Sequence, residues 1–383
     1  MTPENDTRAK RRKILILYAT AGIGHKKAAL AVKGALDETA PKDVEVTITD
    51  ALDLTNAFFK WFYLKSYLLM VSRLPTFWGI LYYLTDSRYV NFMVSKLRRI
   101  NNWLNSGKLR KHLVESGYDV IVSTHFFASE VVARMKSEGV IASRLITVVT
   151  DYRLHSWWVS AGTDVYVVGC EEAKKDLLGW GAAESQVKVL GIPAEPVFSR
   201  PLDADAIRRK VGLEKGVPTI LVIGGGFGVG PIIDIVRTIA RLPGRVQAIA
   251  VCGHNESLTR QVDGMRPLVK GGLHVFGFVS NVYDYMEVSD ILISKSGGIT
   301  VTESLAKDLP LVVISPIIGQ ETRNCDFLLA NGAAMRAGGI PELEAILNDL
   351  AAHPEKIARM RESIRRIRKP SACYDIAGLA LGM

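Results

Sequence analysis

A glycine-rich stretch close to residue 300 holds the side chains that are best suited to chemistry. Gly297 and Gly298 follow a short apolar run, Asp290–Ser294, and glycine lets a backbone turn tightly and pass close to a ligand. The helix expected to begin at Thr300 would present free N–H groups that favour an anion. Glu303, expected in the first turn of that helix, would accept hydrogen bonds from a sugar diol.

The polar loop after the next apolar run extends this pattern. Leu311–Ser315 is expected to return to the sheet, and Gln320 and Glu321 would then follow its carboxyl end. Open α/β sheets bind their ligands at that edge. Together the two segments predict a site for a nucleotide-diphosphate sugar, and the alternative is an ordinary βαβ unit with a capped helix.

A second glycine loop, Gly224–Gly230, follows the expected strand Thr219–Ile223. Its N–H groups could approach the same diphosphate from the other side. A dinucleotide site fits less well, because the glycine spacing differs from Gly-x-Gly-x-x-Gly and because the next strand closes with Cys252 and Gly253 rather than with an acid.

The N-terminal half offers a general base. His25 ends a glycine loop at the start of the expected helix Lys26–Thr39. We expect an exposed imidazole there, with an unperturbed pKa of ~6.5. Such a group could take a proton from an attacking hydroxyl, and the alternative is a histidine that caps the helix.

Asp151 follows the expected strand Leu145–Val149 and could orient His25 or act as the base itself. The alternative is that Asp151 caps a turn and that the nearby His155 lies on the surface. His125 follows another apolar run and is a weaker candidate of the same kind.

Residues 58–111 form a basic aromatic segment. They include ten Lys or Arg residues, one acid (Asp86) and 13 aromatic residues, so this segment alone accounts for the net charge of +9. Such interleaving over broken helical patterns favours a membrane interface, where each Lys or Arg near an anionic surface is worth about 1 kcal/mol. Nucleic acid would suit the charge, but no nucleic-acid motif is present. A helical hairpin with an ordinary aromatic core is the remaining alternative.

The composition sets further limits. A length of 383 residues predicts two domains, and four scattered cysteines without paired spacing argue against a disulfide framework or a zinc site. We expect neither a signal peptide nor a transmembrane helix. Asp203 and Asp205 match the Asp-x-Asp pattern of metal-dependent sugar transferases, but they precede the expected helix Ala206–Val211, where aspartates serve as caps. No metal is therefore expected.

The elements that would position these residues repeat in both halves of the chain. Each half opens with a strand, a glycine loop and a helix, and continues with short apolar runs typical of buried parallel strands. We predict an α/β protein with two Rossmann-like, doubly wound domains that face each other across a cleft. The expected boundaries are residues 1–195 with a helical insertion at about 56–111, residues 196–369, and a helix in 370–383 that packs back on the first domain.

The chain resembles the monogalactosyldiacylglycerol synthases and the bacterial processive diacylglycerol glucosyltransferases of glycosyltransferase family 28. The resemblance covers nearly the whole chain. It rests on Gly22–His25, on Thr150 and Asp151 with His155 and Trp158, on Gly224–Gly230, on Ser294–Thr300, on Glu303, and on Gly319–Glu321 with Asn324. Two departures bear on which sugar or acceptor is used: Ala21 begins a loop that has consecutive glycines in plant members, and Ser156 stands where proline is common.

This resemblance implies a GT-B fold, a UDP-sugar donor held mainly by the second domain, and inversion at the anomeric carbon without a metal or another cofactor. The implied base is His25; ribose would lie at Glu303 and uracil near Phe278 and Val279. The implied donor-binding residues are Gly225, Gly226, Phe227, Gly228, Gly230, Cys252, Gly253, Phe278, Val279, Lys295, Ser296, Gly297, Gly298, Thr300, Glu303, Gln320, Glu321 and Asn324. The expected acceptor and membrane residues are Gly24, His125, His155, Trp158, Phe58, Phe59, Trp61, Phe62, Lys65 and Trp78.

The resulting expectation is a cytoplasmic, peripheral protein on the inner face of the cell membrane that transfers glucose or galactose from a UDP-sugar to diacylglycerol. Its partners would be the UDP-sugar, diacylglycerol or a related lipid, and an anionic membrane surface, but not nucleic acid. Three alternatives remain: a transferase of N-acetylglucosamine to a lipid-linked peptidoglycan precursor, a UDP-N-acetylglucosamine 2-epimerase, and a non-enzymatic UDP-sugar sensor. The sequence leaves open the sugar, the number of sugars added, the acceptor, the oligomeric state, and whether His25 or Asp151 is the base.

Overall fold

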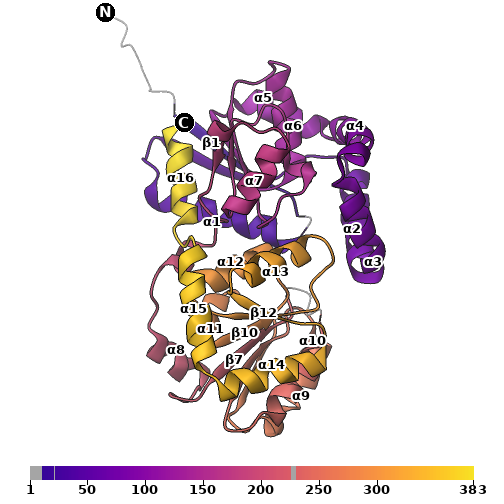
Figure 1. Cartoon of the computed structure of the whole chain (residues 1–383). Coiled ribbons are helices and arrows are strands. Elements are labelled where there is room, and N and C mark those ends of the chain that lie inside the picture. The colour runs from indigo at the N-terminus through magenta and orange to yellow at the C-terminus, as the bar shows by residue number, and fades with distance from the viewer. Residues whose placement is uncertain (1–10, 21, 226–229) are drawn as a thin grey trace, which may run out of the picture.

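The computed structural model describes residues 11–20, 22–225 and 230–383, and it contains two parallel β-sheets. The first sheet has the strand order β2-β1-β3-β4-β5-β6 and the second the order β12-β11-β10-β7-β8-β9. We call the part built on the first sheet the N-terminal lobe and the part built on the second the C-terminal lobe (Figure 1). All strand pairings are parallel, so the predicted α/β class with two doubly wound halves is confirmed.

The strands are short and mostly buried, as expected for sheets covered by helices on both faces. In the N-terminal lobe they are β1 (Arg12–Tyr18), β2 (Val44–Asp50), β3 (Val120–Ser123), β4 (Arg144–Val148), β5 (Val165–Val167) and β6 (Val187–Lys188). In the C-terminal lobe they are β7 (Thr219–Ile223), β8 (Gln247–Val251), β9 (Leu273–Phe276), β10 (Ile291–Ser294), β11 (Leu311–Ile314) and β12 (Ala334–Ala337).

Helices cover both sheets. Those between the strands of the N-terminal lobe are α1 (Ile23–Thr39), α2 (Ala57–Arg73), α3 (Pro75–Thr85), α4 (Arg88–Asn105), α5 (Gly107–Ser116), α6 (Phe126–Ser137) and α7 (Glu171–Gly179). The next eight are α8 (Ala204–Val211), α9 (Ile232–Arg241), α10 (Glu256–Asp263), α11 (Val282–Glu287), α12 (Gly298–Ala306), α13 (Gln320–Ala330), α14 (Ile340–Ala352) and α15 (Glu355–Ile367).

The last helix, α16 (Ala372–Gly382), returns to the N-terminal lobe and lies beside α1 (Figure 1). Cys373 and Ile376 are fully buried in a cluster with Ile14 and Ile16 of β1. The guanidinium of Arg12 donates a hydrogen bond to the carbonyl of Ala380 at 3.0 Å. The C-terminal segment therefore ties the two lobes together after the chain has completed the second sheet.

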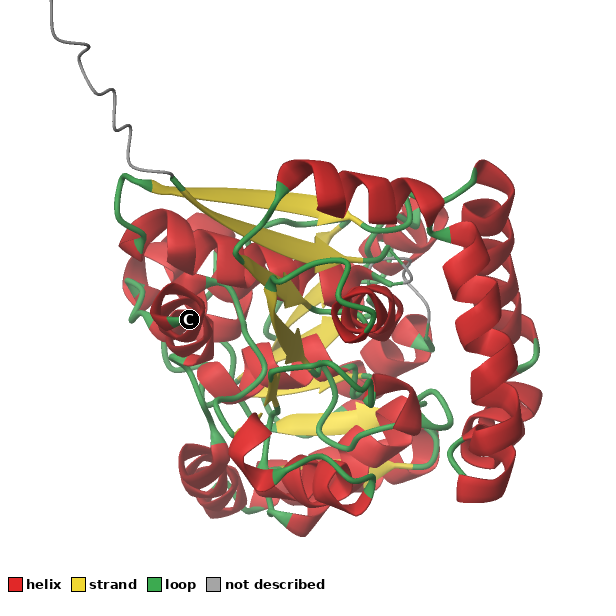
Figure 2. Ribbon diagram, turned by 90° about the horizontal axis from the view of Figure 1, so that it is seen from above, coloured by secondary structure: helices red, strands yellow, loops and turns green. Residues whose placement is uncertain are grey.

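The helices α2, α3 and α4 stand at the outer side of the N-terminal lobe, between β2 and β3 in the chain (Figures 1 and 2). They coincide with the basic aromatic segment. No helix within the described parts of the chain is both long and apolar enough to cross a bilayer. All four cysteines are buried and unpaired, as their spacing predicted.

Two helices begin earlier than the sequence predicted. Helix α1 begins at Ile23 because Gly22, with φ of 141°, supplies the turn, so His25 lies in the first helical turn rather than before it. Helix α12 begins at Gly298, which places Glu303 in its second turn rather than its first. The strand expected at His274–Phe278 ends at Phe276, so Phe278 and Val279 lie in the loop that follows.

The two lobes are in direct contact. Tyr152, just after β4, stacks on Phe327 of α13 with ring centroids 4.6 Å apart and planes 12° apart. The hydroxyl of Tyr152 lies 3.0 Å from Oγ1 of Thr302, and its backbone N–H donates to Oδ1 of Asn324 at 2.8 Å. One buried apolar cluster runs through this contact and includes residues of both sheets.

Candidate active site

His25 is held by backbone and hydroxyl groups that follow β3 and β4. Its Nδ1 lies 2.8 Å from the carbonyl oxygen of Thr124 and 3.1 Å from Oγ1 of Thr150. A carbonyl oxygen can only accept, so Nδ1 carries the proton and Nε2 has the free lone pair. This is the tautomer that a general base needs.

The expected exposure of His25 is wrong. Its side chain is half-buried, and burial lowers the pKa of His25 to about 4, against the opposing effect of the hydrogen bond to Thr124. The sequence predicted an exposed ring at the start of the helix, whereas the ring is covered by His125 at 4.4 Å and by Trp158 at 6.0 Å between ring centroids. The imidazole is therefore neutral at physiological pH.

The other two histidines of this region are bound differently. Nδ1 of His125 accepts from the N–H of Phe127 at 3.1 Å and caps α6, and burial lowers the pKa of His125 well below its usual range. Nδ1 of His155 accepts from the N–H of Trp157 at 3.2 Å. Both rings must therefore carry any proton on Nε2, and neither offers a free lone pair.

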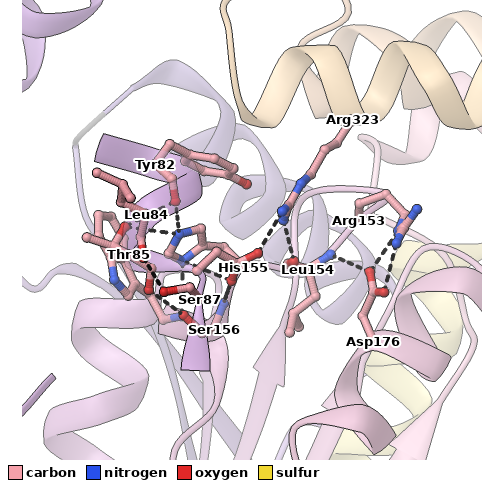
Figure 3. A network of polar contacts seen from close by, with 12 residues as sticks. Tyr82, Leu84, Thr85, Ser87, Arg153, Leu154, His155, Ser156, Asp176 and Arg323 are labelled. Atoms are coloured by element: carbon pink, nitrogen blue, oxygen red, sulfur yellow. Dashed lines mark hydrogen bonds and ion pairs between the residues drawn. The ribbon is translucent and has the colours of Figure 1, made fainter. Parts of the chain in front are cut away.

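His155 joins α3 to the loop after β4. Its Nε2 lies 3.0 Å from the carbonyl oxygen of Tyr82, and the side chain is buried rather than on the surface (Figure 3). Burial lowers the pKa of His155 to about 4, although the nearby Asp86 opposes this effect. The role of His155 in this structure is thus to fix the position of α3.

One of our predictions was that Asp151 orients His25, and this prediction is wrong. Its carboxylate accepts a hydrogen bond from Nδ2 of Asn324 at 3.2 Å, and in the described part of the chain no hydrogen bond joins it to His25. Burial raises the pKa of Asp151 to about 6, against the lowering effects of Asn324 and Arg323. The prediction failed because Asn324, which belongs to the C-terminal lobe, binds this carboxylate.

A cavity of about 250 Å³ lies between α2, α3 and the loops that follow β3 and β4. His25 and Asp151 contribute polar groups to its lining, and the rest of the wall is mainly aromatic. The lining residues are His25, Tyr63, Ser66, Tyr67, Met70, Trp78, Leu81, Tyr82, His125, Phe126, Asp151, His155, Trp157, Trp158 and Gln320.

Only part of this cavity was predicted from the sequence. Of the expected acceptor and membrane residues, Trp78, His125, His155 and Trp158 line it. The side chains of Phe58, Trp61, Phe62 and Lys65 are exposed, and Phe59 is buried in the core of the lobe. Gly24 lies in the first turn of α1, where an added Cβ would touch Ile299 of α12 at 3.4 Å.

Several lining residues were missed. Tyr63, Tyr67 and Met70 lie on one face of α2, and Leu81 and Tyr82 lie on α3. The spacing of Tyr63, Tyr67 and Met70 is that of a helix face, a signal that was available in the sequence. What the sequence could not show is that this face turns towards a cavity rather than towards the core.

The predicted donor residues gather at the carboxyl edge of the second sheet. Gly225 (φ 70°) and Gly230 (φ 142°) flank the second glycine loop, whose Gly226, Phe227 and Gly228 lie outside the described residues. Cys252 and Gly253 follow β8. The segments Lys295–Thr300 and Gln320–Asn324 follow β10 and β11.

Some of these side chains already have protein partners. Oγ of Ser296 donates to the carbonyl of Glu321 at 2.6 Å, and the carboxylate of Glu321 accepts from the N–H of Ile317 at 2.7 Å. Asn324 also donates to the carbonyl of Ser296 at 3.1 Å. These three therefore hold the loop after β10 against the start of α13.

Phe278 has a partner that the sequence analysis did not consider. Its ring stacks on His254 with centroids 4.2 Å apart and planes 10° apart. Both side chains are exposed at the loops after β8 and β9, and Val279 beside them is half-buried. The pair presents a flat aromatic surface at the carboxyl edge of the second sheet.

Glu303 is buried, with 3% of its surface exposed, and its Oε1 accepts from Nζ of Lys27 at 2.7 Å. Burial raises the pKa of Glu303, while Lys27 acts in the opposite direction. Lys27 belongs to α1, so this ion pair crosses from one lobe to the other. The sequence analysis did not single out Lys27.

A second ion pair crosses between the lobes. The guanidinium of Arg323 on α13 lies 2.6 Å from Oδ2 of Asp86. It also lies 2.9 Å from the carbonyl of Leu154 (Figure 3). Asp86 also accepts from the N–H of Ser156 at 2.7 Å. The single acid of the basic aromatic segment thus binds a residue of the C-terminal lobe.

The carboxylate of Asp203 accepts from the N–H of Ala206 at 2.9 Å and caps α8, as predicted. Within the described ranges no group of three or more His, Cys, Asp or Glu side chains is placed to hold a metal ion.

Comparisons with known proteins agree with this geometry. Residues 25–194 match the family model described as monogalactosyldiacylglycerol (MGDG) synthase, and residues 219–368 match the glycosyltransferase family 28 C-terminal domain. Curated proteins named processive diacylglycerol beta-glucosyltransferase from Bacillus cereus (strain ATCC 10987 / NRS 248) and Bacillus anthracis (strain A0248) are 28% identical over 378 residues, which cover 97% of this chain and 94% of each relative.

Solved structures show the same fold. MurG from Acinetobacter baumannii aligns with a TM-score of 0.64 at 15% identity, and UDP-GlcNAc 2-epimerase from Neisseria meningitidis bound to UDP-GlcNAc aligns with 0.60 at 14% identity. Each alignment covers 97% of this chain and 100% of the other. The predicted GT-B arrangement of two facing lobes is confirmed.

Proposed function

Because this chain belongs to the family of the monogalactosyldiacylglycerol synthases and processive diacylglycerol glucosyltransferases, we propose that it is a UDP-sugar-dependent hexosyltransferase. It transfers glucose or galactose to the hydroxyl of diacylglycerol. The observation that carries the proposal is the aromatic cavity, because its lining includes both His25, whose Nε2 has the free lone pair, and Gln320, which follows β11 at the carboxyl edge of the second sheet.

The proposed reaction uses the groups that meet at the cleft. The diacylglycerol hydroxyl loses its proton to Nε2 of His25, and its oxygen bonds to the anomeric carbon from the face opposite UDP. The bond from that carbon to the diphosphate oxygen breaks, and UDP leaves with the electron pair. Backbone N–H groups at Gly225 and Gly230 and at the start of α12 stabilise the negative charge. The step inverts the anomeric carbon.

Two side chains compete for the role of base. His25 has the suitable tautomer and Thr124 and Thr150 orient it, but its pKa of about 4 makes it a weak base in the ligand-free protein. Asp151 has the higher pKa, about 6, and lines the same cavity. We propose His25 as the base on its geometry, with Asp151 supporting the imidazolium once it forms.

The lipid would enter from an anionic membrane surface that the outer helices contact. On α4 the apolar side chains Tyr89, Met93, Leu97, Ile100 and Leu104 follow helical spacing and are between 54% and 90% exposed. Lys96 and Arg99 lie between them in the sequence. This stripe suits an interfacial helix. The chain would then be a peripheral protein of the inner membrane face, with its acceptor cavity lined by the adjacent helices α2 and α3.

The test is a transfer assay with radiolabelled UDP-glucose, UDP-galactose and UDP-N-acetylglucosamine on vesicles that contain diacylglycerol. Mass spectrometry of the lipid product should identify a hexosyl diacylglycerol. His25→Ala should lower kcat by roughly 10²- to 10⁴-fold, the usual contribution of a general base.

The alternatives are separated by the same assay with two additions: vesicles that carry a lipid-linked peptidoglycan precursor, and chromatography of the nucleotide sugars. A product formed only from UDP-N-acetylglucosamine on a lipid-linked peptidoglycan precursor would favour the transferase of that sugar. Conversion of UDP-N-acetylglucosamine to its 2-epimer would identify an epimerase. Binding of UDP without any product would leave a sensor.

A further inference from the structure

The ion pair between Lys27 and Glu303 joins two helix N-terminal regions across the cleft. Nζ of Lys27 lies 2.7 Å from Oε1 of Glu303. Glu303 is buried, whereas about a third of the Lys27 side chain, 32%, is exposed. The lysine therefore extends from a partly exposed position on α1 to a buried carboxylate on α12. A buried carboxylate needs such a partner, because an unpaired charge is costly inside a protein.

The two helices approach closely at their first turns. An added Cβ at Gly24 of α1 would lie 3.4 Å from Ile299 of α12, and one at Gly298 would clash with the carbonyl oxygen of Thr150. Lys27 lies one helical turn from Gly24, and Glu303 lies one to two turns from Gly298. The N-terminus of α12, where a diphosphate is expected, is thus a short distance from both members of the pair.

Ribose and Lys27 compete for one carboxylate. The sequence predicts that Glu303 accepts hydrogen bonds from the ribose diol of the donor, and these would displace the ammonium of Lys27. The displaced cation would stand beside the cleft on a flexible four-carbon stem. The diphosphate of the same donor lies one sugar ring from the diol and carries the negative charge that a lysine pairs with as a point charge.

We infer that Lys27 is a donor-binding residue contributed by the N-terminal lobe: Glu303 holds it in the ligand-free protein, and the nucleotide diphosphate receives it when ribose occupies Glu303. This inference rests on the proposed UDP-sugar donor. The diphosphate would then contact a cation from the N-terminal lobe in addition to the backbone N–H groups of the C-terminal lobe. Donor binding would then draw α1, and with it His25, towards the sugar.

The test compares uridine with UDP by isothermal titration calorimetry on the full chain, in wild type and Lys27→Met. Uridine carries ribose but no phosphate, so it reports the site at Glu303 alone. The variant should bind uridine at least as tightly as wild type, because a competitor for Glu303 is gone. It should lower the ratio of UDP affinity to uridine affinity by roughly tenfold or more, the effect of one charge-assisted hydrogen bond.

Lys26→Met is the matched control, because Lys26 is the exposed neighbour of Lys27 on the same helix. It should leave the affinity ratio unchanged. Lys27→Arg should keep most of the ratio, since it keeps the charge. Glu303→Gln should weaken uridine binding while it keeps the ratio, and this variant tests the idea even if Lys27→Met unfolds.

An unchanged ratio of UDP affinity to uridine affinity in Lys27→Met, with both ligands gaining affinity equally, would overturn the inference. Lys27 would then serve only to pair with Glu303 in the ligand-free protein. An equal loss of ratio in Lys26→Met would also overturn it, because general charge would then explain the effect. If wild type bound neither ligand, the proposed function itself would fail.

Discussion

Arg323 and Asp86 form an ion pair of 2.6 Å that joins α13, the helix that follows β11, to the C-terminal end of α3 beside the aromatic cavity. Arg323 lies three residues after Gln320, which lines that cavity, and its guanidinium also lies over the ring of Tyr82 at 5.2 Å. Asp86 in turn binds the N–H of Ser156 next to His155. A movement of either lobe must therefore move or break this pair.

Removal of this pair should impair both stability and transfer. Both partners are largely buried, so Arg323→Met should lower the free energy of unfolding by more than the ~1 kcal/mol of an exposed pair and up to about 3–5 kcal/mol. Denaturant unfolding and kcat on vesicles measure the two effects. Arg153→Met is the control, because the neighbouring pair Arg153–Asp176 is more exposed and stays within one lobe (Figure 3). Equal effects of the two variants would speak against a link between the lobes.

The pH profile of transfer should reveal which group must be unprotonated. Burial raises the pKa of Asp151 to about 6, so a mechanism that needs its carboxylate loses kcat/KM as the pH falls through 6. The pKa of His25 is lowered to about 4, so a mechanism that needs only neutral His25 keeps its rate down to about pH 5. We expect the limb near pH 6 in wild type, because the proposed imidazolium needs Asp151, and its loss in Asp151→Asn. A flat profile to pH 5 in wild type would exclude a role for ionised Asp151.

Gly298 should be needed for closure of the cleft. Any Cβ there would meet the backbone carbonyl of Thr150 in the other lobe, and a backbone atom cannot move aside as a side-chain end can. Gly298→Ala should lower kcat/KM at least tenfold while each lobe keeps its fold, as circular dichroism and the transfer assay would show. Gly378→Ala in α16 is the control, because no atom lies within 4 Å of the added Cβ. Full activity of Gly298→Ala would show that the observed contact between the lobes is dispensable.

Membrane binding should depend on the exposed face of α4. Met93→Glu combined with Leu97→Glu replaces two apolar side chains, each worth about 1.5–3 kcal/mol when buried in an apolar phase. Vesicle flotation with anionic lipid should therefore show a loss of binding of more than tenfold. Leu268→Glu changes a similarly exposed leucine in the C-terminal lobe and should bind normally. Equal binding of both variants would place the membrane contact elsewhere.

The sequence was informative wherever a local pattern decides the structure. Short β-branched runs separated by glycine loops were enough to predict two parallel sheets, and the position of Glu303 and Gln320 after such runs predicted the edge at which they lie. Aromatic residues in the basic segment also showed a helical spacing. These signals depend only on neighbours in the chain, so they can be read without the fold.

The tertiary structure alone decided the state of the reactive groups. His125 and Trp158 cover the ring of His25, and the carbonyl of Thr124 sets its tautomer. The partner of Asp151 is Asn324, which is 173 residues away in the chain. Likewise Lys27 meets Glu303 only because two helices from different lobes touch. A pKa, a tautomer and an ion pair depend on which distant groups exclude water from a side chain, and no spacing along the chain specifies those groups.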